Sequence, residues 1–313
     1  MTTHSVVSYF CGCGGLDLGF RGGFDYHGQH YKKNPFRFLA AYDNNSSCIE
    51  TYNSYFSDKG TVADLKELDP NDVPDADILL GGFPCQDFSS SGPLKGLTSE
   101  RGRLYKVMTK YMDAHHPKIV IGENVLNLSR MEDGEVIQKI TDDLVACGYH
   151  VKVWTIFAPD YGVPQSRTRL IFVCVRNDIA GFPEEPKPAF KDNHRSIEWA
   201  IGDLVSITDE TVPNQSQYFR ASVAKKGNGQ GDEKCDRNKP AYTIRANPKS
   251  RIQFHYSLDR RLTVRECARI QTFPDDFVFK HSMTTSISQI GNAVPPVLAH
   301  QIAQSVNDFL IKA

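Results

Sequence analysis

Between residues 5 and 176, short apolar runs and longer amphipathic stretches follow one another along the chain. Apolar, β-branched and aromatic residues predict buried strands over residues 5–10, 38–42, 78–80, 118–122, 150–158 and 169–176. Apolar residues at helical spacing predict helices over residues 46–56, 104–115 and 135–147. We therefore expect these strands to form one large sheet with helices between them.

The pattern changes after residue 178. Pro183, Pro186 and Pro188 indicate a linker, and the residues that follow form short mixed segments and glycine-rich turns, which predict a small domain with little helix. Residues 263–266 (TVRE) have the pattern of a capping box that opens a helix. A last helix from residue 295 carries an apolar stripe and is expected to pack on the first domain. The predicted domains are thus 1–178 with 284–313, 183–262, and a hinge over 263–283.

Composition describes an ordinary globular protein: of 313 residues, 23% are charged and 40% hydrophobic. No stretch approaches the ~20 apolar residues that span a bilayer, and the N-terminus lacks a signal-like apolar run, so we expect a cytoplasmic protein without membrane contact. The eight cysteines are scattered, which favours reduced thiols over a disulfide framework.

The net charge of -1 is unevenly distributed. Residues 220–269 hold 13 Lys or Arg against 5 Asp or Glu, a local net charge of +8, so the rest of the chain carries about -9. Such asymmetry is typical of a protein whose one face follows phosphates, although a solvated face is an equally good interpretation of the charge alone.

Cys85 follows a buried strand and a tight turn. The apolar run at residues 78–80 is stopped by two glycines and a proline, which brings the thiol to the rim of the sheet. A thiol at that position can act as a nucleophile once it is deprotonated. Taken alone, Cys85 is more readily interpreted as a small hydrophobe, as most cysteines are.

Six segments, in this order, resemble the motifs of the DNA (cytosine-5) methyltransferases of bacterial restriction-modification systems. They are residues 10–16 (FCGCGGL), 84–86 (PCQ), 123–125 (ENV), 165–169 (QSRTR), 265–269 (RECAR) and 291–296 (GNAVPP). The resemblance runs from about residue 5 to the C-terminus and fails between roughly 183 and 240, where family members differ by target. It implies an α/β fold: a Rossmann-like S-adenosylmethionine-dependent methyltransferase sheet with helices on both faces, plus a small, mostly β target-recognition domain.

The resemblance also implies an S-adenosyl-L-methionine site. A glycine-rich turn after the first strand lets a ligand approach the backbone, and Asp43 after the second predicted strand can accept both ribose hydroxyls. Asp64 matches the position that meets the adenine amino group. The full predicted cofactor set is Phe10, Gly12, Gly14, Gly15, Leu16, Asp43, Asn44, Asp64, Leu65, Pro84, Asn292 and Ala293.

The resemblance assigns the chemistry to four residues. Cys85 would add to carbon 6 of a flipped-out cytosine, and Glu123 would hold nitrogen 3 and the amino group of the ring. Arg167 and Arg169 would orient the base. Residues 241–245 (AYTIR) resemble the centre of the recognition region, with Ile244 in place of the usual leucine. The predicted DNA contacts are Gln86, Ser89, Ser91, Arg101, Thr243 and Arg245.

The partners expected are double-stranded DNA and a restriction endonuclease encoded separately, and one small recognition region indicates a monomer. A tRNA cytosine-5 methyltransferase is an alternative, but the Cys-Phe-Thr signature of that branch is missing from the sequence. A catalytically silent DNA binder would be expected to have lost Cys85, Glu123 or the glycines. No metal site is predicted, because Cys11 and Cys13 lack partner ligands. A dinucleotide-dependent oxidoreductase is not expected either, because the loop after Phe10 does not have the dinucleotide-binding fingerprint.

Overall fold

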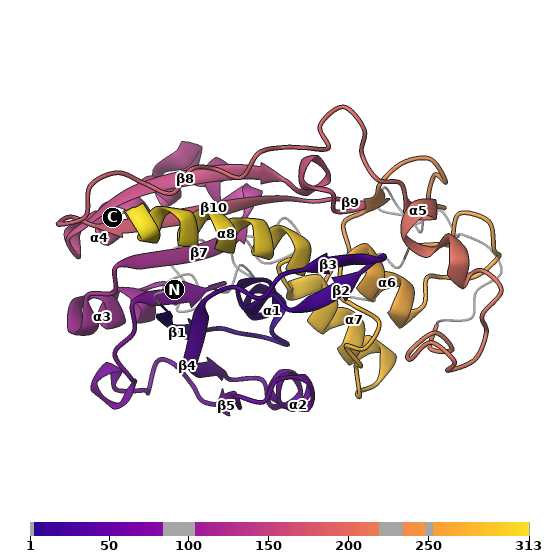
Figure 1. The fold of residues 1–313 in the computed structure, drawn as a ribbon, viewed down its shortest axis with the longest axis horizontal. Helices are drawn as coiled ribbons and strands as arrows, with labels where there is room; N and C mark the ends of the chain where they lie inside the picture. The colour runs from indigo at the N-terminus through magenta and orange to yellow at the C-terminus, as the bar shows by residue number, and fades with distance from the viewer. Residues whose placement is uncertain (1–2, 84–103, 219–233, 248–252, 313) are drawn as a thin grey trace.

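A seven-stranded sheet forms the centre of the structure, a computed structural model that describes residues 3–83, 104–218, 234–247 and 253–312 (Figure 1). Side by side, its strands are β5 (Thr61–Val62), β4 (Phe36–Asp43), β1 (His4–Tyr9), β6 (Ile78–Gly81), β7 (Ile119–Val125), β10 (Thr168–Arg176) and β8 (Tyr149–Phe157). All neighbours are parallel except β10, which is antiparallel to both β7 and β8. The predicted α/β sheet is confirmed, and it contains all six predicted strands.

Helices cover both faces of this sheet, so its central strands are apolar on both sides. On one face, Val6 and Ile78 pack in a cluster with α1 (Gly15–Arg21) and α8 (Pro296–Lys312). On the other, Val7 and Leu79 pack in a cluster with α3 (Lys106–His115) and α4 (Glu135–Ala146). Figure 1 shows α8 lying along the sheet, although it is the last helix of the chain.

The predicted apolar stripe of the last helix is confirmed. Leu298, Ile302 and Val306 of α8 are buried against the sheet, and Phe309 packs beside them. The C-terminal residues of the chain therefore complete the domain that the N-terminal strand begins.

The remaining elements are short or lie around the sheet. They are a hairpin of β2 (Phe24–Tyr26) and β3 (Gln29–Tyr31), the helices α2 (Ser46–Tyr55), α5 (Ile197–Ile201), α6 (Val264–Ile270) and α7 (Met283–Asn292), the strands β9 (Gln165–Ser166) and β11 (Ala241–Tyr242), and the 3-10 segments η1 (Pro70–Asp72), η4 (Leu126–Gly134), η5 (Ala158–Tyr161) and η6 (Gly202–Leu204).

One strand is longer than predicted. The sequence predicts a strand over residues 118–122 that ends before Glu123, whereas β7 continues to Val125. It does so because β10 pairs with it that far, with Ile171 opposite Glu123 and Arg169 opposite Val125. Glu123 is thus held within the sheet and not in a loop.

The segment predicted as a mostly β domain has less regular structure than expected. Among its described residues it holds α5, η6, the two-residue strand β11 and isolated bridges at Phe254. Side-chain amides take the place of strand ladders here: Gln253 Nε2 donates to the carbonyl oxygen of Tyr242 at 2.6 Å, and Gln165 Oε1 accepts the N–H of Ile244 at 2.9 Å. Because these partners are side chains, no regular strand pattern in the sequence predicts them.

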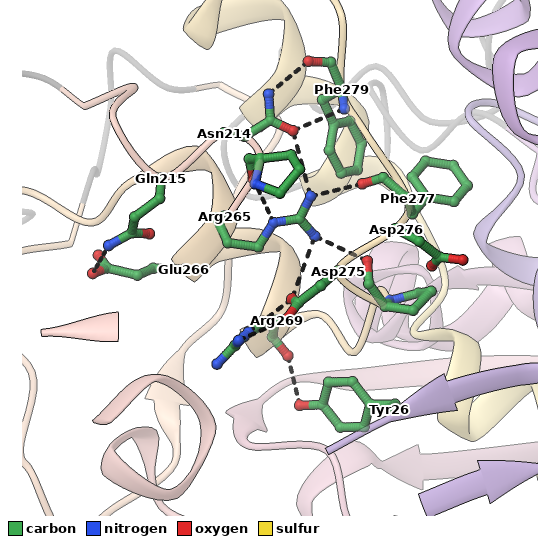
Figure 2. Close-up of polar contacts among 12 residues, drawn as sticks. Tyr26, Asn214, Gln215, Arg265, Glu266, Arg269, Asp275, Asp276, Phe277 and Phe279 are labelled. Carbon is green, nitrogen blue, oxygen red and sulfur yellow. Dashed lines mark hydrogen bonds and ion pairs between the residues drawn. The ribbon is translucent and has the colours of Figure 1, made fainter. Parts of the chain in front are cut away.

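Helix α6 ties this segment to the first domain. Thr263 and Glu266 form the predicted capping box, which is confirmed. Arg265 in the first turn of α6 is fully buried. Its guanidinium donates to the carbonyl oxygens of Pro213, Pro274 and Phe277 (Figure 2).

The core on this side is continuous. One apolar cluster joins Tyr52 of α2, and Phe56 at the end of that helix, with Leu262, Phe273 and Phe277 around α6. The described part of the segment therefore packs directly on the first domain. No helix in the described ranges has both the length and the apolar composition needed to cross a membrane.

Candidate active site

The parallel strands end in register at one edge of the sheet. Tyr9 of β1 lies opposite both Tyr42 of β4 and Gly81 of β6. Gly81 in turn lies opposite Gly122 of β7. The residues that follow these positions are Phe10, Asp43, Gly82 and Glu123. In open α/β sheets, ligands bind outside the carboxyl ends of the strands, so the predicted cofactor and catalytic residues meet where the fold favours a site.

Asp43 holds the glycine-rich loop to the end of β4. Its Oδ2 accepts the N–H of Gly12 at 2.9 Å, and its Oδ1 accepts the N–H of Asn45 at 2.8 Å. Burial raises the pKa of the Asp43 carboxyl, and the two N–H donors counteract that rise. A carboxylate has about four acceptor positions, so Asp43 can accept further hydrogen bonds from a ligand.

Two glycines of the loop lie where a side chain would collide with neighbours. Gly14 has φ +93°, and a Cβ there would lie 2.4 Å from the ring of Phe56. A Cβ on Gly15 would lie 2.5 Å from the carbonyl oxygen of Val294. The loop is therefore pressed against both α2 and the turn before α8, and it starts α1 with its backbone close to the strand edge.

The other predicted cofactor residues occupy the same edge with different exposure. Leu16 and Leu65 are buried, Phe10 and Ala293 are half-buried, and Asn44, Asn292 and Asp64 are exposed. Asp64 follows β5, and its carboxylate accepts the N–H of Lys66 and pairs with the Lys66 ammonium at 3.8 Å. Pro84 lies outside the described residues.

The strand that leads to Cys85 is described as far as Phe83. Cys85 itself, with Pro84, Gln86, Ser89, Ser91 and Arg101, lies outside the described residues. Phe83 is buried against Phe172 and Tyr105, at ring-centroid distances of 5.8 and 6.2 Å. Asn124 Nδ2 donates to the carbonyl oxygen of Phe83 at 3.3 Å. The residue two positions before Cys85 is thus fixed by both its ring and its backbone.

Glu123 and Arg169 form a buried ion pair at the end of β7. The Nε atom of Arg169 lies 2.7 Å from Oε1 of Glu123, yet the N–H does not point at the oxygen as in a hydrogen bond, and neither atom has another hydrogen-bond partner among the described residues. A Cβ built on Gly82 would lie 3.6 Å from Oε2 of Glu123. The carboxylate therefore lies between the strand that leads to Cys85 and a guanidinium, with an acceptor atom available to a ligand.

Arg167 is placed differently from its neighbour Arg169. It is buried, and its guanidinium donates to the carbonyl oxygens of Ile244, Gly291 and Ala293 at 3.4, 3.0 and 3.1 Å. Arg169 reaches Glu123, whereas Arg167 reaches backbone carbonyls of two other segments. Of these two arginines, Arg169 is the one that the contacts among the described residues place against Glu123.

Thr243 and Arg245, the two predicted DNA contacts among the described residues, flank Ile244, whose carbonyl oxygen accepts from Arg167. Thr243 is half-buried and donates through Oγ1 to the carbonyl oxygen of Ser166, and Arg245 is half-buried two residues later. Tyr242, the last residue of β11, is exposed. The segment 241–245 therefore presents side chains to solvent while its backbone is attached to β9.

Asn124 is a site residue to which the sequence predicts no role. Its Oδ1 accepts the N–H of Val125 and its Nδ2 holds Phe83, so its side chain links two strand ends. The sequence feature that could have pointed to Asn124 is its place beside Glu123 in the segment ENV.

Asp17 of α1 is another buried polar residue to which the sequence predicts no role. Its carboxyl accepts hydrogen bonds from Ser8 Oγ at 2.7 Å and Tyr52 OH at 2.9 Å, and burial raises its pKa.

A cleft of about 620 Å³ lies elsewhere, between the β2–β3 hairpin and residues 274–276. Its charged lining includes Asp203, Arg269 and Asp275. The carboxylates of Asp203 and Asp275 both form ion pairs with Arg269. It contains none of the predicted catalytic residues. Within the described ranges, no group of His, Cys, Asp and Glu side chains is arranged to hold a metal ion.

Comparison of the sequence with known proteins identifies one family. The sequence model of the family described as "C-5 cytosine-specific DNA methylase" matches residues 4–308. The chain is 33% identical to the Type II methyltransferase M.NgoFVII of Neisseria gonorrhoeae, over 96% of this chain and 86% of that protein. It is 31% identical to the Type II methyltransferase M.BspRI of Lysinibacillus sphaericus, over 97% of this chain and 82% of that protein.

Solved structures share the fold over the whole chain. A DNA modification methyltransferase encoded within a prophage of E. coli superposes with a TM-score of 0.73 at 22% identity, covering 98% of this chain and 99% of that one. The Dnmt2 methyltransferase of S. pombe superposes with a TM-score of 0.70 at 17% identity, covering 99% of both chains.

Proposed function

The chain belongs to the C-5 cytosine-specific DNA methylase family and is a DNA (cytosine-5) methyltransferase, and we propose that it moves a methyl group from S-adenosyl-L-methionine to a flipped-out cytosine through Cys85. The observation that carries this assignment of residues is the position of the Glu123 carboxylate. It lies beside Gly82, which follows β6 and comes shortly before Cys85, and is paired with Arg169. A nucleophile and an acidic group at adjacent strand ends are what addition to a cytosine ring requires.

The residues at the ends of β1 and β4 suit the proposed cofactor. Asp43 is a half-buried carboxylate with acceptor positions that ribose hydroxyls can use. Gly12, at φ +55°, has open space where a side chain would stand, so a ligand can approach the backbone there. When bound, S-adenosyl-L-methionine supplies an electrophilic methyl group. The proposed set is completed by Phe10, Gly14, Gly15, Leu16, Asn44, Asp64, Leu65, Pro84, Asn292 and Ala293.

The chemistry then divides among the chain's own residues. The Cys85 thiolate adds to carbon 6 of cytosine, which makes carbon 5 electron-rich and able to take the methyl group. Glu123 holds nitrogen 3 and the exocyclic amino group, where charge develops as the thiolate adds. Arg169 holds the Glu123 carboxylate in place. A base then removes the carbon 5 proton, and the carbon–sulfur bond breaks to release Cys85 as a thiolate.

The substrate is proposed to be double-stranded DNA. Carbon 6 of a stacked cytosine is out of reach, so the base must leave the stack, at a cost of a few kcal/mol. The net charge of +8 over residues 220–269 suits the phosphate backbone, with Thr243 and Arg245 near the bases. Gln86, Ser89, Ser91 and Arg101 are proposed DNA contacts from the loop after Cys85.

The cellular role is proposed from the relatives. The curated relatives named above are Type II methyltransferases, and we infer that this chain likewise works beside a restriction endonuclease that is encoded separately. One recognition segment suffices for a monomer acting on one short site.

Bisulfite sequencing tests the proposed function directly. DNA from cells that express the chain is compared with DNA from cells that express Cys85→Ser, with both proteins soluble. We expect protected cytosines confined to one short motif in the first sample and none in the second. Protection that persists in Cys85→Ser would contradict the covalent mechanism. No protection in either sample, with labelled methyl groups appearing on tRNA, would favour the RNA methyltransferase, and no transfer at all would favour a silent DNA binder.

A further inference from the structure

Arg167 joins two segments that are far apart in sequence. Its Nη1 donates to the carbonyl oxygens of Ile244 and Gly291, and its Nη2 donates to that of Ala293. Ile244 belongs to the proposed recognition segment, and Ala293 to the turn of the proposed cofactor site. A single planar guanidinium with fixed donor directions thus sets the distance between these two segments.

Two glutamines reinforce the same junction. Gln165 Oε1 accepts the N–H of Ile244, and its Nε2 donates to the side-chain oxygen of Gln271. Gln271 Nε2 donates to the carbonyl oxygen of Ala293. The glutamines are fully buried, so a break in this chain of hydrogen bonds would leave polar groups without water.

The backbones on either side of the junction are in direct contact. A Cβ on Gly291 would lie 2.4 Å from the carbonyl carbon of Arg245 and 2.5 Å from the nitrogen of Ala246. On the other side, a Cβ on Gly15 would lie 2.9 Å from the Cβ of Ala293. Close packing of this kind transmits displacement, because no flexible side chain lies between the segments to absorb it.

We infer that Arg167 is a positioning residue that couples target-DNA binding to cofactor binding. DNA contacts at Thr243 and Arg245 would shift residues 291–294, at the end of α7, through Arg167 and Gly291. Ala293 and Val294 in turn lie against Gly15 of the cofactor loop. The inference rests on the proposed function of both sites. Coupling is reciprocal, so DNA must change cofactor affinity by the same factor by which the cofactor changes DNA affinity.

The experiment measures that factor in full-length protein. Calorimetry gives the Kd of S-adenosylhomocysteine alone and in the presence of a duplex that carries the motif identified by bisulfite sequencing. The variants are Arg167→Lys, which keeps the charge but not the planar fork, and Gly291→Ala, which adds a methyl group against the backbone of residues 245–246. Gly202→Ala is the matched control, because Gly202 has a right-handed helical backbone and its nearest neighbour is the flexible side chain of Glu198, at 3.3 Å.

We expect a coupling factor clearly different from one in the wild type and in Gly202→Ala. In Arg167→Lys and Gly291→Ala we expect that factor to move toward one by about 2- to 30-fold, the range found for residues that carry coupling. Weakened binding of both ligands with an unchanged coupling factor would show a merely structural role and overturn the inference, as would a wild-type factor of one. A wild type that binds no S-adenosylhomocysteine would instead show that the proposed cofactor is wrong.

Discussion

Asn124 Nδ2 donates to the carbonyl oxygen of Phe83, 3.3 Å away, and so joins the strand that carries Glu123 to the strand that leads to Cys85. The same side chain accepts the N–H of Val125 through Oδ1. It is almost fully buried, so both hydrogen bonds are shielded from water. This amide therefore helps to fix the backbone of Phe83, two residues before the proposed nucleophile, beside the strand that carries the proposed acid.

Asn124→Ala should therefore slow catalysis. We expect kcat to fall about 10- to 100-fold, because small displacements of a reacting group have large effects on rate. Stability should fall by about 1–3 kcal/mol, the cost of leaving a buried polar group unpaired. Steady-state kinetics and chemical denaturation measure the two effects.

Asn34→Ala is the control for that substitution. Asn34 is also buried and donates to the carbonyl oxygens of Gly19 and Phe20, but it precedes β4 and lies near the opposite edge of the sheet. It should lose similar stability with kcat unchanged. Equal rate losses in the two variants would show that Asn124 acts only through stability.

Asp43→Asn should weaken cofactor binding selectively. The amide keeps the shape of the side chain, but its NH₂ group cannot accept an N–H from Gly12 or Asn45 and cannot accept a ribose hydroxyl. We expect the Kd of S-adenosylhomocysteine to rise about 10- to 100-fold, as for the loss of hydrogen bonds to a charged group. DNA affinity measured without cofactor should be unchanged. Asp178→Asn, an exposed residue beyond β10, should change neither; an unchanged cofactor Kd in Asp43→Asn would remove Asp43 from the site.

The sheet was predictable because its strands are short apolar runs. The loop at the carboxyl end of the first strand was predictable because glycines follow that strand directly. Residues such as Ile78 and Leu79 are buried on opposite faces, and a run of this kind fits only a sheet covered on both sides. Asp43 and Glu123 could be proposed as site residues because each follows a short apolar run, and Glu123 also lies in a family motif. These are local properties of the sequence.

The contacts of Arg167 and Asn124 were not predictable from local pattern. Two arginines at positions i and i+2 of one strand would share a face, and the sequence predicts that both reach the base. The structure places Arg167 in the break between β9 and β10, so its side chain turns toward residues 244, 291 and 293 while Arg169 reaches Glu123. Partners so distant along the chain become neighbours only in the fold.

Arg265→Met should destabilise the junction around α6. The buried guanidinium donates to three backbone carbonyls and contacts Asn214 Oδ1, and burial lowers its pKa to about 10 (Figure 2). Replacement by an apolar side chain of similar length leaves those carbonyls buried without a donor, so we expect a loss of about 3 kcal/mol or more in the free energy of unfolding.

The matched control for Arg265 is Arg176→Met, at a half-exposed arginine paired with Asp178. We expect a change within about 0.5 kcal/mol there, as for most surface substitutions. Urea denaturation of both variants makes the comparison. Similar stabilities for the two would show that the carbonyl groups around Arg265 find other partners.

His255 should make stability depend on pH in the mildly acidic range. The imidazole is fully buried, and burial lowers its pKa to about 4 from an ordinary value of 6.5, with the nearby Glu266 opposing this shift and Arg260 and Lys234 adding to it. Nδ1 accepts the N–H groups of Ser257 and Leu258 at 3.1 and 3.2 Å, and protonation of Nδ1 would break both hydrogen bonds.

The sign follows from proton binding. Between pH 6.5 and about 4 the unfolded chain binds a proton at His255 that the folded chain does not, so stability falls as pH falls through that window. The full contribution of the wild-type imidazole is at most about 3 kcal/mol. His255→Asn keeps an acceptor for the two N–H groups but does not titrate, so its stability should depend less steeply on pH. Denaturation series at pH 7, 6, 5 and 4 would measure this, and parallel curves for the two proteins would show that His255 is not the group responsible.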